Sequence, residues 1–336
     1  MDIREAARKF GWPKSRMKVC ELTLNYACNA RCVFCYSSPD MEEWKGKDDM
    51  RYRQAADYLM FSYRNGARMV QFIGGEPTIY PELPKLVRLA KKIGYPAIQV
   101  ISNGINLGDR AYASELAACG MNTASISIHG DNAAMHDAVT GIKGSFKKAV
   151  RACGNLLDLG VYLNINTAIT ALNYRQLPAF TGFALDNFRT DSVHLIAAHF
   201  TGAAGRSPEK LIVRYSLQAP YLREAIAAFG RRRVRPAFRF LSNYVPCLLP
   251  EHANLMKDWE LPDRDDDLFL PEEKHVGRMY AMVTDKLRAK AETCSRCVYN
   301  GVCAGFEKNY AAHFGRGEFR PVSGKRTIFA VRPVHG

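Results

Sequence analysis

Residues 18–36 read KVCELTLNYACNARCVFCY, and this stretch joins a strand-like run to three closely spaced cysteines. Its first part, residues 18–26, is a short apolar run with Val, Leu and Thr, which predicts a buried β-strand. Its second part places Cys28, Cys32 and Cys35 in the pattern C-x3-C-x2-C. The stretch therefore predicts a strand whose following loop presents three thiols on one short segment.

The strand-like pattern recurs along the chain and alternates with longer helical stretches. Further strands are expected at 69–73, 97–102, 123–128, 161–168 and 192–197, and helices near 50–66, 83–94, 110–119, 144–159 and 174–187. Alternation at this spacing predicts parallel βα units joined by right-handed crossovers. Six such units form either an open sheet or a partial barrel, and periodicity does not separate the two. In both folds, ligands bind at the loops that follow the carboxyl ends of the strands.

The alternation ends near residue 200, which divides the chain into three parts. We expect a lead-in over residues 1–17, an α/β core over 18–204 and a C-terminal region over 205–336. After the last expected strand, the pattern predicts a loop at 201–210, helices at 216–230 and 274–291, and no regular period across 243–275.

Composition indicates a chain that folds around its own apolar core. It has 336 residues, of which 47% are hydrophobic, enough for one large α/β domain and a smaller appendage. No apolar run reaches the length of a bilayer-spanning helix, and the N-terminus lacks the apolar segment of a signal peptide. We therefore expect a cytoplasmic protein that does not associate with a membrane.

The chain holds ten cysteines, which are unevenly spread. In a reducing compartment thiols persist as ligands, nucleophiles or core residues rather than disulfides. Besides the three near the start, three more lie within ten residues near the end, and such clustering favours metal ligation. Cys20, Cys119 and Cys153 stand alone in apolar or helical surroundings, and we expect them to be plain core or surface thiols.

The formal net charge of +14 raises the question of an anionic partner. Much of the charge is local, because residues 206–239 hold nine Lys and Arg against Glu209 and Glu224. An acidic stretch follows at 263–267. One interpretation is a solvated basic helix end facing an acidic loop, and the other is a docking site for an anionic substrate. No recognised nucleic-acid module lies there, so nucleic acid is the less favoured partner.

The three thiols at Cys28, Cys32 and Cys35 suit an iron–sulfur cluster. Thiolates are the usual ligands of a [4Fe–4S] unit, and three of them leave one iron without a protein ligand. An open coordination site is typical of a metal centre that binds a reactant. Zinc is the alternative, but structural zinc sites prefer paired C-x2-C knuckles and four protein ligands.

This spacing, with Phe34 before the last cysteine and Tyr36 after it, resembles the signature of the radical S-adenosylmethionine (SAM) superfamily. The resemblance implies an α/β fold, a partial (β/α)6 TIM-like barrel with a small C-terminal iron–sulfur extension. It also implies that the open iron chelates the amino and carboxylate groups of SAM. One electron would then cleave the sulfonium to methionine and a 5′-deoxyadenosyl radical that abstracts a substrate hydrogen.

Polar motifs at the expected strand ends extend the resemblance over roughly residues 18–200. Gly74-Gly75-Glu76-Pro77 follows the second strand and looks like the family's GGEP motif, with glycines that let a ligand approach and acceptors for the SAM ammonium. Asn103 follows the third strand in a polar-Asn-Gly turn, Ser127 ends the fourth and would face the SAM carboxylate, and Asn166 on the fifth would serve the ribose. Taken singly, each is also an ordinary turn or cap. The SAM-binding residues implied by the resemblance are Phe34, Gly74, Gly75, Glu76, Pro77, Asn103, Ser127 and Asn166.

The run from His129-Gly130 through His136-Asp137 to Thr140-Gly141 resembles a loop of molybdenum-cofactor-cyclase-like and peptide-modifying relatives. We interpret it as a structural clasp and part of the substrate wall rather than a metal site. His129 is also a candidate for proton handling.

The second cysteine group, Cys294, Cys297 and Cys303, has the pattern C-x2-C-x5-C and resembles the C-terminal half of SPASM or twitch extensions. Those hold auxiliary [4Fe–4S] clusters, and this chain has thiols for one, with Cys247 as the natural fourth ligand. Ligation by all four would make an electron relay, whereas an iron left open by Cys247 would bind substrate. A zinc ribbon is the structural alternative.

The substrate does not follow from these motifs. By analogy with SPASM-like proteins, we favour a ribosomal peptide or an amino-acid-derived substrate, with a reductant such as flavodoxin or ferredoxin. The alternatives are small-molecule cofactor or natural-product biosynthesis of the molybdenum-cofactor-cyclase type, and an RNA-modifying radical SAM transferase. Cyclases of that type usually end in a Gly-Gly tail, whereas this chain ends Arg332-Pro333-Val334-His335-Gly336.

Overall fold

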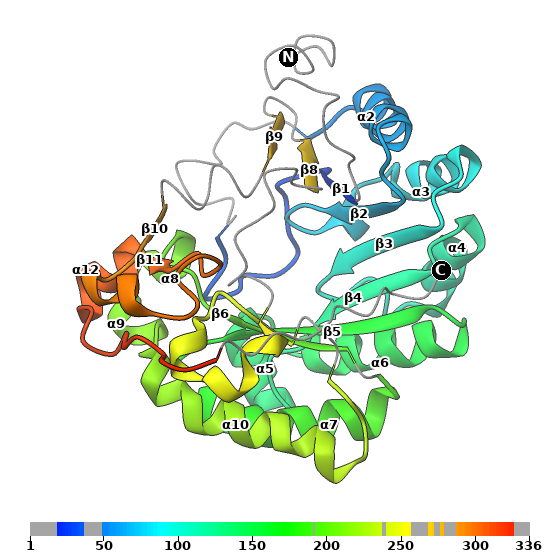
Figure 1. The fold of residues 1–336 in the computed structure, drawn as a ribbon. Helices are drawn as coiled ribbons and strands as arrows, with labels where there is room; N and C mark the ends of the chain where they lie inside the picture. The colour runs from blue at the N-terminus through cyan, green and yellow to red at the C-terminus, as the bar shows by residue number, and fades with distance from the viewer. Residues whose placement is uncertain are drawn as a thin grey trace.

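A computed structural model describes residues 19–36, 49–190, 192–236, 240–256, 268–271, 276–278 and 287–325 of the chain. One curled sheet dominates it, with strands in the order β7-β6-β5-β4-β3-β2-β1-β8-β9 (Figure 1). The six central strands are β1 (Val19–Thr23), β2 (Met69–Ile73), β3 (Ala97–Ser102), β4 (Thr123–Ser127), β5 (Tyr162–Ile169) and β6 (Val193–Ala197). They are mutually parallel. The fold class is thus the expected α/β partial barrel.

Short strands extend the sheet at both edges. β7 (Leu241–Ser242) pairs parallel with β6, β8 (Leu268–Pro271) pairs parallel with β1, and β9 (Val276–Arg278) pairs antiparallel with β8. All three come from the region after residue 205, so this part of the chain completes the sheet at its two edges. Their lengths of two to four residues are too short to leave a clear period-2 pattern.

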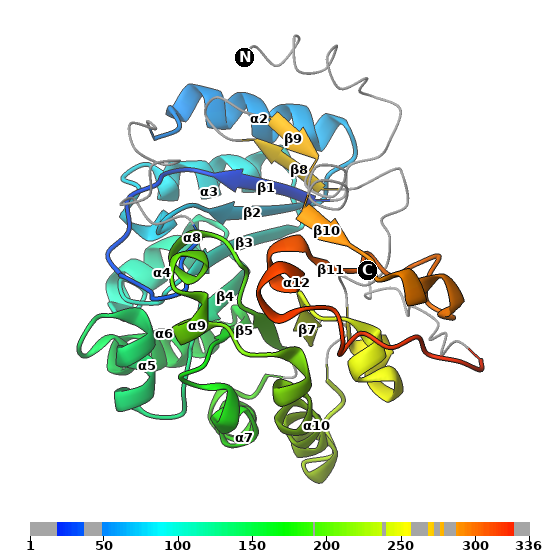
Figure 2. The same cartoon turned by 90° about the vertical axis from the view of Figure 1, so that its left-hand side faces the viewer.

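Helices cover the outer face of the sheet (Figures 1 and 2). They are α2 (Tyr52–Arg64), α3 (Leu83–Ile93), α4 (Arg110–Cys119), α6 (Ser145–Asp158), α7 (Leu177–Phe188) and α10 (Tyr215–Arg231), with α5 (Ala133–Thr140) before α6 and the 3-10 helices η1 (Pro77–Ile79) and η2 (Tyr174–Gln176) in loops. Buried strand residues such as Leu22, Phe72 and Ile126 join one core with buried helix residues such as Leu86 and Leu156.

The opposite, concave face of the sheet is lined with polar side chains. Successive residues of a strand point to opposite faces, so the register places Ser127, Asn166 and His194 side by side on three neighbouring strands. All three are half-buried, unlike the apolar residues between them. A polar inner face is what a barrel that binds a ligand requires.

The C-terminal region forms a small layer near β7 (Figure 2). Its elements are η3 (Pro246–Leu248), η4 (Pro250–Leu255), η5 (Glu292–Arg296) and α12 (Lys308–Phe314), together with a two-stranded antiparallel sheet of β10 (Arg288–Ala289) and β11 (Phe306–Glu307). Tyr215, Tyr310 and Phe319 pack there as a fully or nearly buried aromatic cluster. The short helices α8 (Gly202–Arg206) and α9 (Pro208–Leu211) follow β6 in the chain.

Four expectations about local structure were wrong. Residues 276–278 and 288–289 are strands, so the helix predicted over 274–291 does not include them, and most of the remaining range lies outside the described residues. The loop predicted at 201–210 holds the short helices α8 and α9. The segment 133–140 is the helix α5. The fourth concerns strand lengths, since β1 ends at Thr23 rather than at residue 26.

The three solitary thiols lie in the core, as expected. Cys20, Cys119 and Cys153 are buried and belong to the core, and burial raises the pKa of Cys20 to about 12. Among the described residues, no helix has the length and apolar character needed to cross a membrane.

Candidate active site

The loop after β1, residues 24–36, carries the first three cysteines and is hydrogen-bonded to the Gly-Gly loop after β2. The amide of Gly75 donates to the carbonyl of Asn25 (2.8 Å), and the amide of Glu76 donates to the carbonyl of Ala27 (2.9 Å). A Cβ at Gly74 would stand 2.3 Å from Asn25 Oδ1, and one at Gly75 would stand 2.3 Å from the Ala27 carbonyl oxygen. The glycines are therefore required because the cysteine loop itself lies so close to them. From the sequence we expected them to make room for a ligand instead.

Glu76 links this loop to the end of β3 through a buried carboxylate. Its Oε1 accepts from the amide (3.0 Å) and hydroxyl (2.6 Å) of Thr78 and from the hydroxyl of Ser102 (2.8 Å), while Oε2 accepts from the amide of Asn103 (2.8 Å). Burial raises the pKa of Glu76, and these hydrogen bonds oppose that shift. Glu76 is 1% exposed, and its buried carboxylate holds the loops after β2 and β3 together.

An amide network connects the first cysteine to the loop after β3. Asn103 Nδ2 donates to Asn29 Oδ1 (2.7 Å) and faces Cys28 Sγ at 3.8 Å. Asn29 Nδ2 in turn donates to Asn106 Oδ1 (3.2 Å), and Asn106 Nδ2 donates to the Thr78 carbonyl (3.2 Å). The cysteine loop is thus tied to the ends of β2 and β3 together.

The helix α5 holds the other side of the cysteine loop. The amides of Arg31 and Val33 donate to the carbonyls of Thr140 (2.9 Å) and Val139 (3.0 Å) at its C-terminus. Asp137 on the same helix accepts from the amides of residues 144 and 146 and from the Ser145 hydroxyl, at 2.6–2.9 Å. This geometry is that of the clasp expected for residues 129–141.

The two histidines of this clasp are buried and neutral. His129 Nδ1 accepts from the Ala168 amide (3.3 Å), and His136 Nδ1 accepts from the His129 amide (3.1 Å). Burial lowers the pKa of His129 to about 3 and that of His136 to about 4. Phe34 packs edge-on against the His129 ring, with centroids 4.9 Å apart.

The third side of the cysteine loop meets the segment after β6. The amide of Ala203 donates to the carbonyl of Cys35 (2.8 Å). Gly202 has a positive φ of 62°, and a Cβ there would stand 2.3 Å from that same carbonyl oxygen. Glycine is needed at this position for both its φ and the close contact.

The three thiols are half-buried neighbours. Burial raises the pKa of Cys28 to about 11, and the nearby charges of Glu76 and Cys35 raise it further. Burial also raises the pKa of Cys32, with Cys35 and Cys28 as the next largest contributions. Thiols that raise one another's pKa stay protonated until a cation binds between them.

The predicted SAM-facing residues divide into two groups. Ser127 and Asn166 are half-buried register partners on the concave face of β4 and β5, with the carbonyl of Asn166 accepting from the Ile128 amide (2.9 Å). Phe34 and Asn103 are half-buried beside the cysteines. Glu76 and Pro77, by contrast, are buried in the loop, and the two glycines present backbone only.

The four remaining predicted ligands gather far from β1 in the sequence. Cys247, Cys294, Cys297 and Cys303 all line one hollow of about 320 Å³, counting the solvent at its mouth, together with Pro246, Lys290, Tyr299, Asn300 and Arg320. Burial raises the pKa of Cys247 to about 12, and the charges of the other three thiols raise it further. Cys247 therefore lies with the C-terminal group, as expected from the sequence. Within the described ranges, no three His, Cys, Asp or Glu side chains are grouped tightly enough to hold a single metal ion.

A model of the radical SAM superfamily matches residues 22–180, which span β1 to α7 and include the three-cysteine loop. The segment of this chain from β1 to α7 therefore carries a radical SAM domain. The curated relatives include the probable GTP 3′,8-cyclases of Saccharolobus solfataricus, 28% identical over 198 residues, and of Saccharolobus islandicus, 27% identical over 196 residues. Each alignment covers 58% of this chain and 60% of the relative, so the match spans well under two thirds of their length.

Solved structures with a similar fold cover more of the chain. Streptococcus suis SuiB bound to the precursor peptide SuiA has a TM-score of 0.65 at 14% identity, covering 95% of this chain and 78% of SuiB. The structure of anSMEcpe with bound AdoMet has a TM-score of 0.63 at 16% identity, covering 89% of this chain and 95% of that protein. These likenesses show the fold, including the presence of a C-terminal extension on the radical SAM core.

The residues present fit the [4Fe–4S] cluster and SAM that the radical SAM family implies. Three half-buried thiols lie on one loop, where Cys28 and Cys35 are near enough to Cys32 to raise its pKa, and thiolates are the donors that an iron–sulfur cluster takes. The adjoining concave face offers Ser127 and Asn166 as polar groups that are not fully buried. The amides Asn25, Asn29 and Asn106 and the hydroxyl of Ser102 were missed from the sequence, because isolated polar residues near a strand end carry no pattern of their own.

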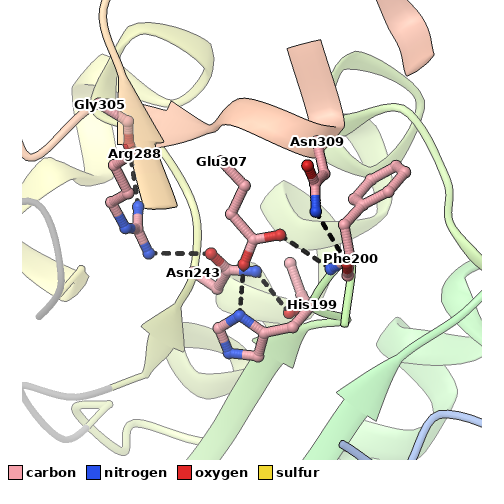
Figure 3. Close-up of polar contacts among 8 residues, drawn as sticks. His199, Phe200, Asn243, Arg288, Gly305, Glu307 and Asn309 are labelled. Carbon is pink, nitrogen blue, oxygen red and sulfur yellow. Dashed lines mark hydrogen bonds and ion pairs between the residues drawn. The ribbon is translucent and has the colours of Figure 1, made fainter. Parts of the chain in front are cut away.

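The extension docks on the radical SAM core through a buried polar junction (Figure 3). Glu307 bonds His199 Nδ1 and accepts from the Phe200 amide (2.8 Å), just after β6. Arg288 donates to the Gly305 carbonyl (2.8 Å) and to Asn243 Oδ1 (2.9 Å). Burial is the largest single influence and raises the pKa of Glu307, but the bond and charge of His199, the Phe200 amide and the charge of Arg288 together outweigh it, and the pKa is lowered. The junction was also missed from the sequence.

Proposed function

We propose that this chain is a radical SAM enzyme with two [4Fe–4S] clusters that oxidatively modifies a ribosomal peptide or an amino-acid-derived substrate. The observation that carries the proposal is the placement of Cys28, Cys32 and Cys35 at the carboxyl edge of a parallel half-barrel, held on three sides by the loops after β2, β3 and β6 and by α5. The division into a core of 18–204 and an auxiliary region of 205–336 is part of this proposal. The expected lead-in, residues 1–17, lies outside the described residues.

In this proposal the first three thiols hold the cluster that reductively cleaves SAM to a 5′-deoxyadenosyl radical. The chain's own residues do the positioning. Asn103 supports Cys28 through its amide, Phe34 fills the space between the loop and His129, and the pair Ser127 and Asn166 offers hydroxyl and amide groups to SAM. A flavodoxin or ferredoxin would supply the electron.

We assign Glu76 a positioning role. Its two oxygens already accept four hydrogen bonds from the chain, which leaves little capacity for the SAM ammonium expected from the sequence. The free backbone carbonyls of the Gly-Gly loop are the better acceptors for that group.

Four thiols around one hollow support an auxiliary cluster with full ligation. A zinc ribbon at the same four thiols is the structural alternative, and metal analysis of the reconstituted protein separates the two. Full ligation by Cys247, Cys294, Cys297 and Cys303 makes the second site a carrier of electrons. It leaves no iron there for substrate.

A peptide substrate is supported by the extent of the structural likeness. SuiB, which was crystallised with its precursor peptide, resembles this chain over 95% of its length, extension included. The likeness to the GTP cyclases was detected over 58% of the chain. GTP 3′,8-cyclisation is the second candidate, because those relatives are the more similar in sequence. The C-terminal tail that counted against it lies outside the described residues.

The basic stretch 206–239 gives less support to an RNA substrate than its charge suggests. Arg232 forms a bidentate pair with Asp186 (2.6 Å to each oxygen), and Arg223 pairs with Glu251 (2.6 Å). Arginines paired in this way have their positive charge neutralised, so they are less available to bind a phosphate backbone. The acidic loop at 263–267 lies outside the described residues.

The substrate classes can be separated by one assay of SAM cleavage. The reconstituted enzyme is incubated with SAM, dithionite and either GTP or short peptides encoded beside its gene, and 5′-deoxyadenosine and product masses are measured. A peptide that raises 5′-deoxyadenosine and loses two hydrogens supports the proposal. Stimulation by GTP with a cyclised nucleotide product would replace it with the cyclase function.

A further inference from the structure

A single lysine stands in the wall of the auxiliary four-cysteine hollow. Lys290 follows β10, is half-buried and lines the hollow with all four thiols. Its ammonium is held by Asn300 alone, through the carbonyl (2.5 Å) and the side-chain Oδ1 (3.3 Å). Among the described residues no carboxylate pairs with it.

The neighbouring cation differs in this respect. Arg288 is buried and lies opposite Glu307 in the β10–β11 pair, and the two charges act on one another. Its charge is therefore largely compensated within the junction. Arg320 also lines the hollow but is exposed, where solvent screens it. Lys290 is thus a half-buried cation in the wall of the hollow for which the described residues provide no carboxylate partner.

A half-buried ammonium without a counter-ion is costly unless a negative group lies near it. The thiols supply one when they bind metal as thiolates. The charge of Lys290 already acts on Cys303, where it favours the thiolate. A cluster with four thiolate ligands is an anion, and reduction by one electron makes it more negative, so a nearby cation favours the reduced form.

The first cysteine site has the opposite charge beside it. Glu76 acts on both Cys28 and Cys32 and disfavours their thiolates. The hydrogen bonds to sulfur also differ between the two sites. At the first site Ala30 N (3.4 Å) and Asn103 Nδ2 (3.8 Å) donate to Cys28, whereas at the auxiliary site Gly305 N donates to Cys303 (3.3 Å) and Val322 N donates to Cys297 (3.4 Å). Net charge, sulfur hydrogen bonds and exposure set the potential of a cluster, and Lys290 contributes to the net charge at the auxiliary site.

We propose that Lys290 raises the reduction potential of a cluster at the auxiliary site, because its positive charge in the wall of the hollow favours the more negative, reduced form. This inference rests on the proposed function, since it requires a cluster at the four cysteines. The chemistry that fits is a net two-electron oxidation. The substrate loses one hydrogen atom to the 5′-deoxyadenosyl radical, one electron to the auxiliary site and one proton to solvent, and a new bond or unsaturation results.

Redox titration of reconstituted protein tests the proposal without a substrate. The triple variant C28A/C32A/C35A leaves the auxiliary site alone, and its reduction is followed by visible absorbance and electron paramagnetic resonance against dithionite-poised mediators. We expect Lys290→Met to lower the ratio of reduced to oxidised cluster about tenfold at fixed potential, a shift of about 59 mV. Lys290→Arg, which keeps the charge, should titrate within a factor of about two of the parent. Lys147→Met on α6 is the matched control for loss of a lysine elsewhere.

Each outcome decides a different point. An unchanged midpoint in Lys290→Met with full iron content overturns the assignment of Lys290. If that variant does not fold, Lys290→Gln, which also removes the positive charge, is titrated in its place. Metal analysis that finds zinc and no iron in the triple variant would overturn the auxiliary cluster, and the inference with it, while leaving the radical SAM core intact.

Discussion

Replacing Gly75 by alanine should loosen the first cysteine site while sparing the auxiliary one. The added Cβ would lie 2.3 Å from the Ala27 carbonyl oxygen and 2.4 Å from that of Tyr26. Both contacts are with backbone, so the cysteine loop must move. Overpacking of this kind costs about 1–3 kcal/mol. The amides of Gly75 and Glu76 would also lose their bonds to this loop, at about 1 kcal/mol each.

The expected result is a destabilisation of about 3–5 kcal/mol, measured by urea unfolding under anaerobic conditions. Reconstituted Gly75→Ala should also lack about four irons and form no 5′-deoxyadenosine. The matched control is Gly154→Ala. A Cβ at Gly154, inside α6, meets nothing within 4 Å, so that variant should gain about 0.5–1 kcal/mol. If Gly75→Ala unfolds like the parent and keeps its full iron content, the packing of the two loops is not what holds the site.

Three further predictions test the clasp, the histidines and the junction. Asp137→Asn should lower the free energy of unfolding by about 1–2 kcal/mol in the same urea assay, because it weakens three hydrogen bonds to residues 144–146. An unchanged urea midpoint would show that these bonds do not stabilise the clasp. Since burial keeps His129 and His136 neutral, with pKa values of about 3 and about 4, while an unfolded histidine titrates near 6.5, stability should fall as the pH drops from about 6.5 toward 4. A flat urea midpoint over that range would show that the rings are protonated in the folded chain. Because the pKa of Glu307 is lowered in the folded chain, its carboxylate contributes stability above the unfolded pKa, and this is lost as the pH falls through the folded value. Glu307→Gln should therefore weaken the fall of the urea midpoint below about pH 4.5. An unaltered pH dependence would argue against the junction.

Much of the core could be predicted because its signals are local. All six central strands and the helices α2, α3, α4 and α6 lie within a few residues of their expected positions, since runs of apolar residues alternate with punctuating Gly and Pro. The cysteine spacing identified the first site for a similar reason. Three ligands on one loop need no tertiary information to be recognised.

The parts that escaped prediction depend on contacts between distant segments. β7, β8 and β9 are two to four residues long and exist because the sheet edges accept them. In the sequence, α5 is indicated only by its two ends. Asn132 caps its N-terminus (3.0 Å to the Met135 amide), and Gly141 ends it in a left-handed conformation. The bond between His199 and Glu307 joins residues 108 positions apart, and no local pattern marks either one.

The buried carboxylate of Glu76 shows a different limit. The GGEP motif located the loop correctly, yet its glycines serve the neighbouring backbone and its glutamate serves Thr78, Ser102 and Asn103. A motif gives the position of a residue and not the direction in which its side chain points. Cys247 is the contrasting case, since the expected fourth thiol lies with its three partners around one hollow.

The central claim is that the loop of Cys28, Cys32 and Cys35 holds the cluster that cleaves SAM. The most direct measurement compares the anaerobically reconstituted parent with the variant C28A/C32A/C35A, counting iron and assaying 5′-deoxyadenosine after SAM and dithionite are added. The parent should bind about eight irons and form 5′-deoxyadenosine, and the variant should keep about four irons and form none. Continued formation of 5′-deoxyadenosine by the variant would contradict the account.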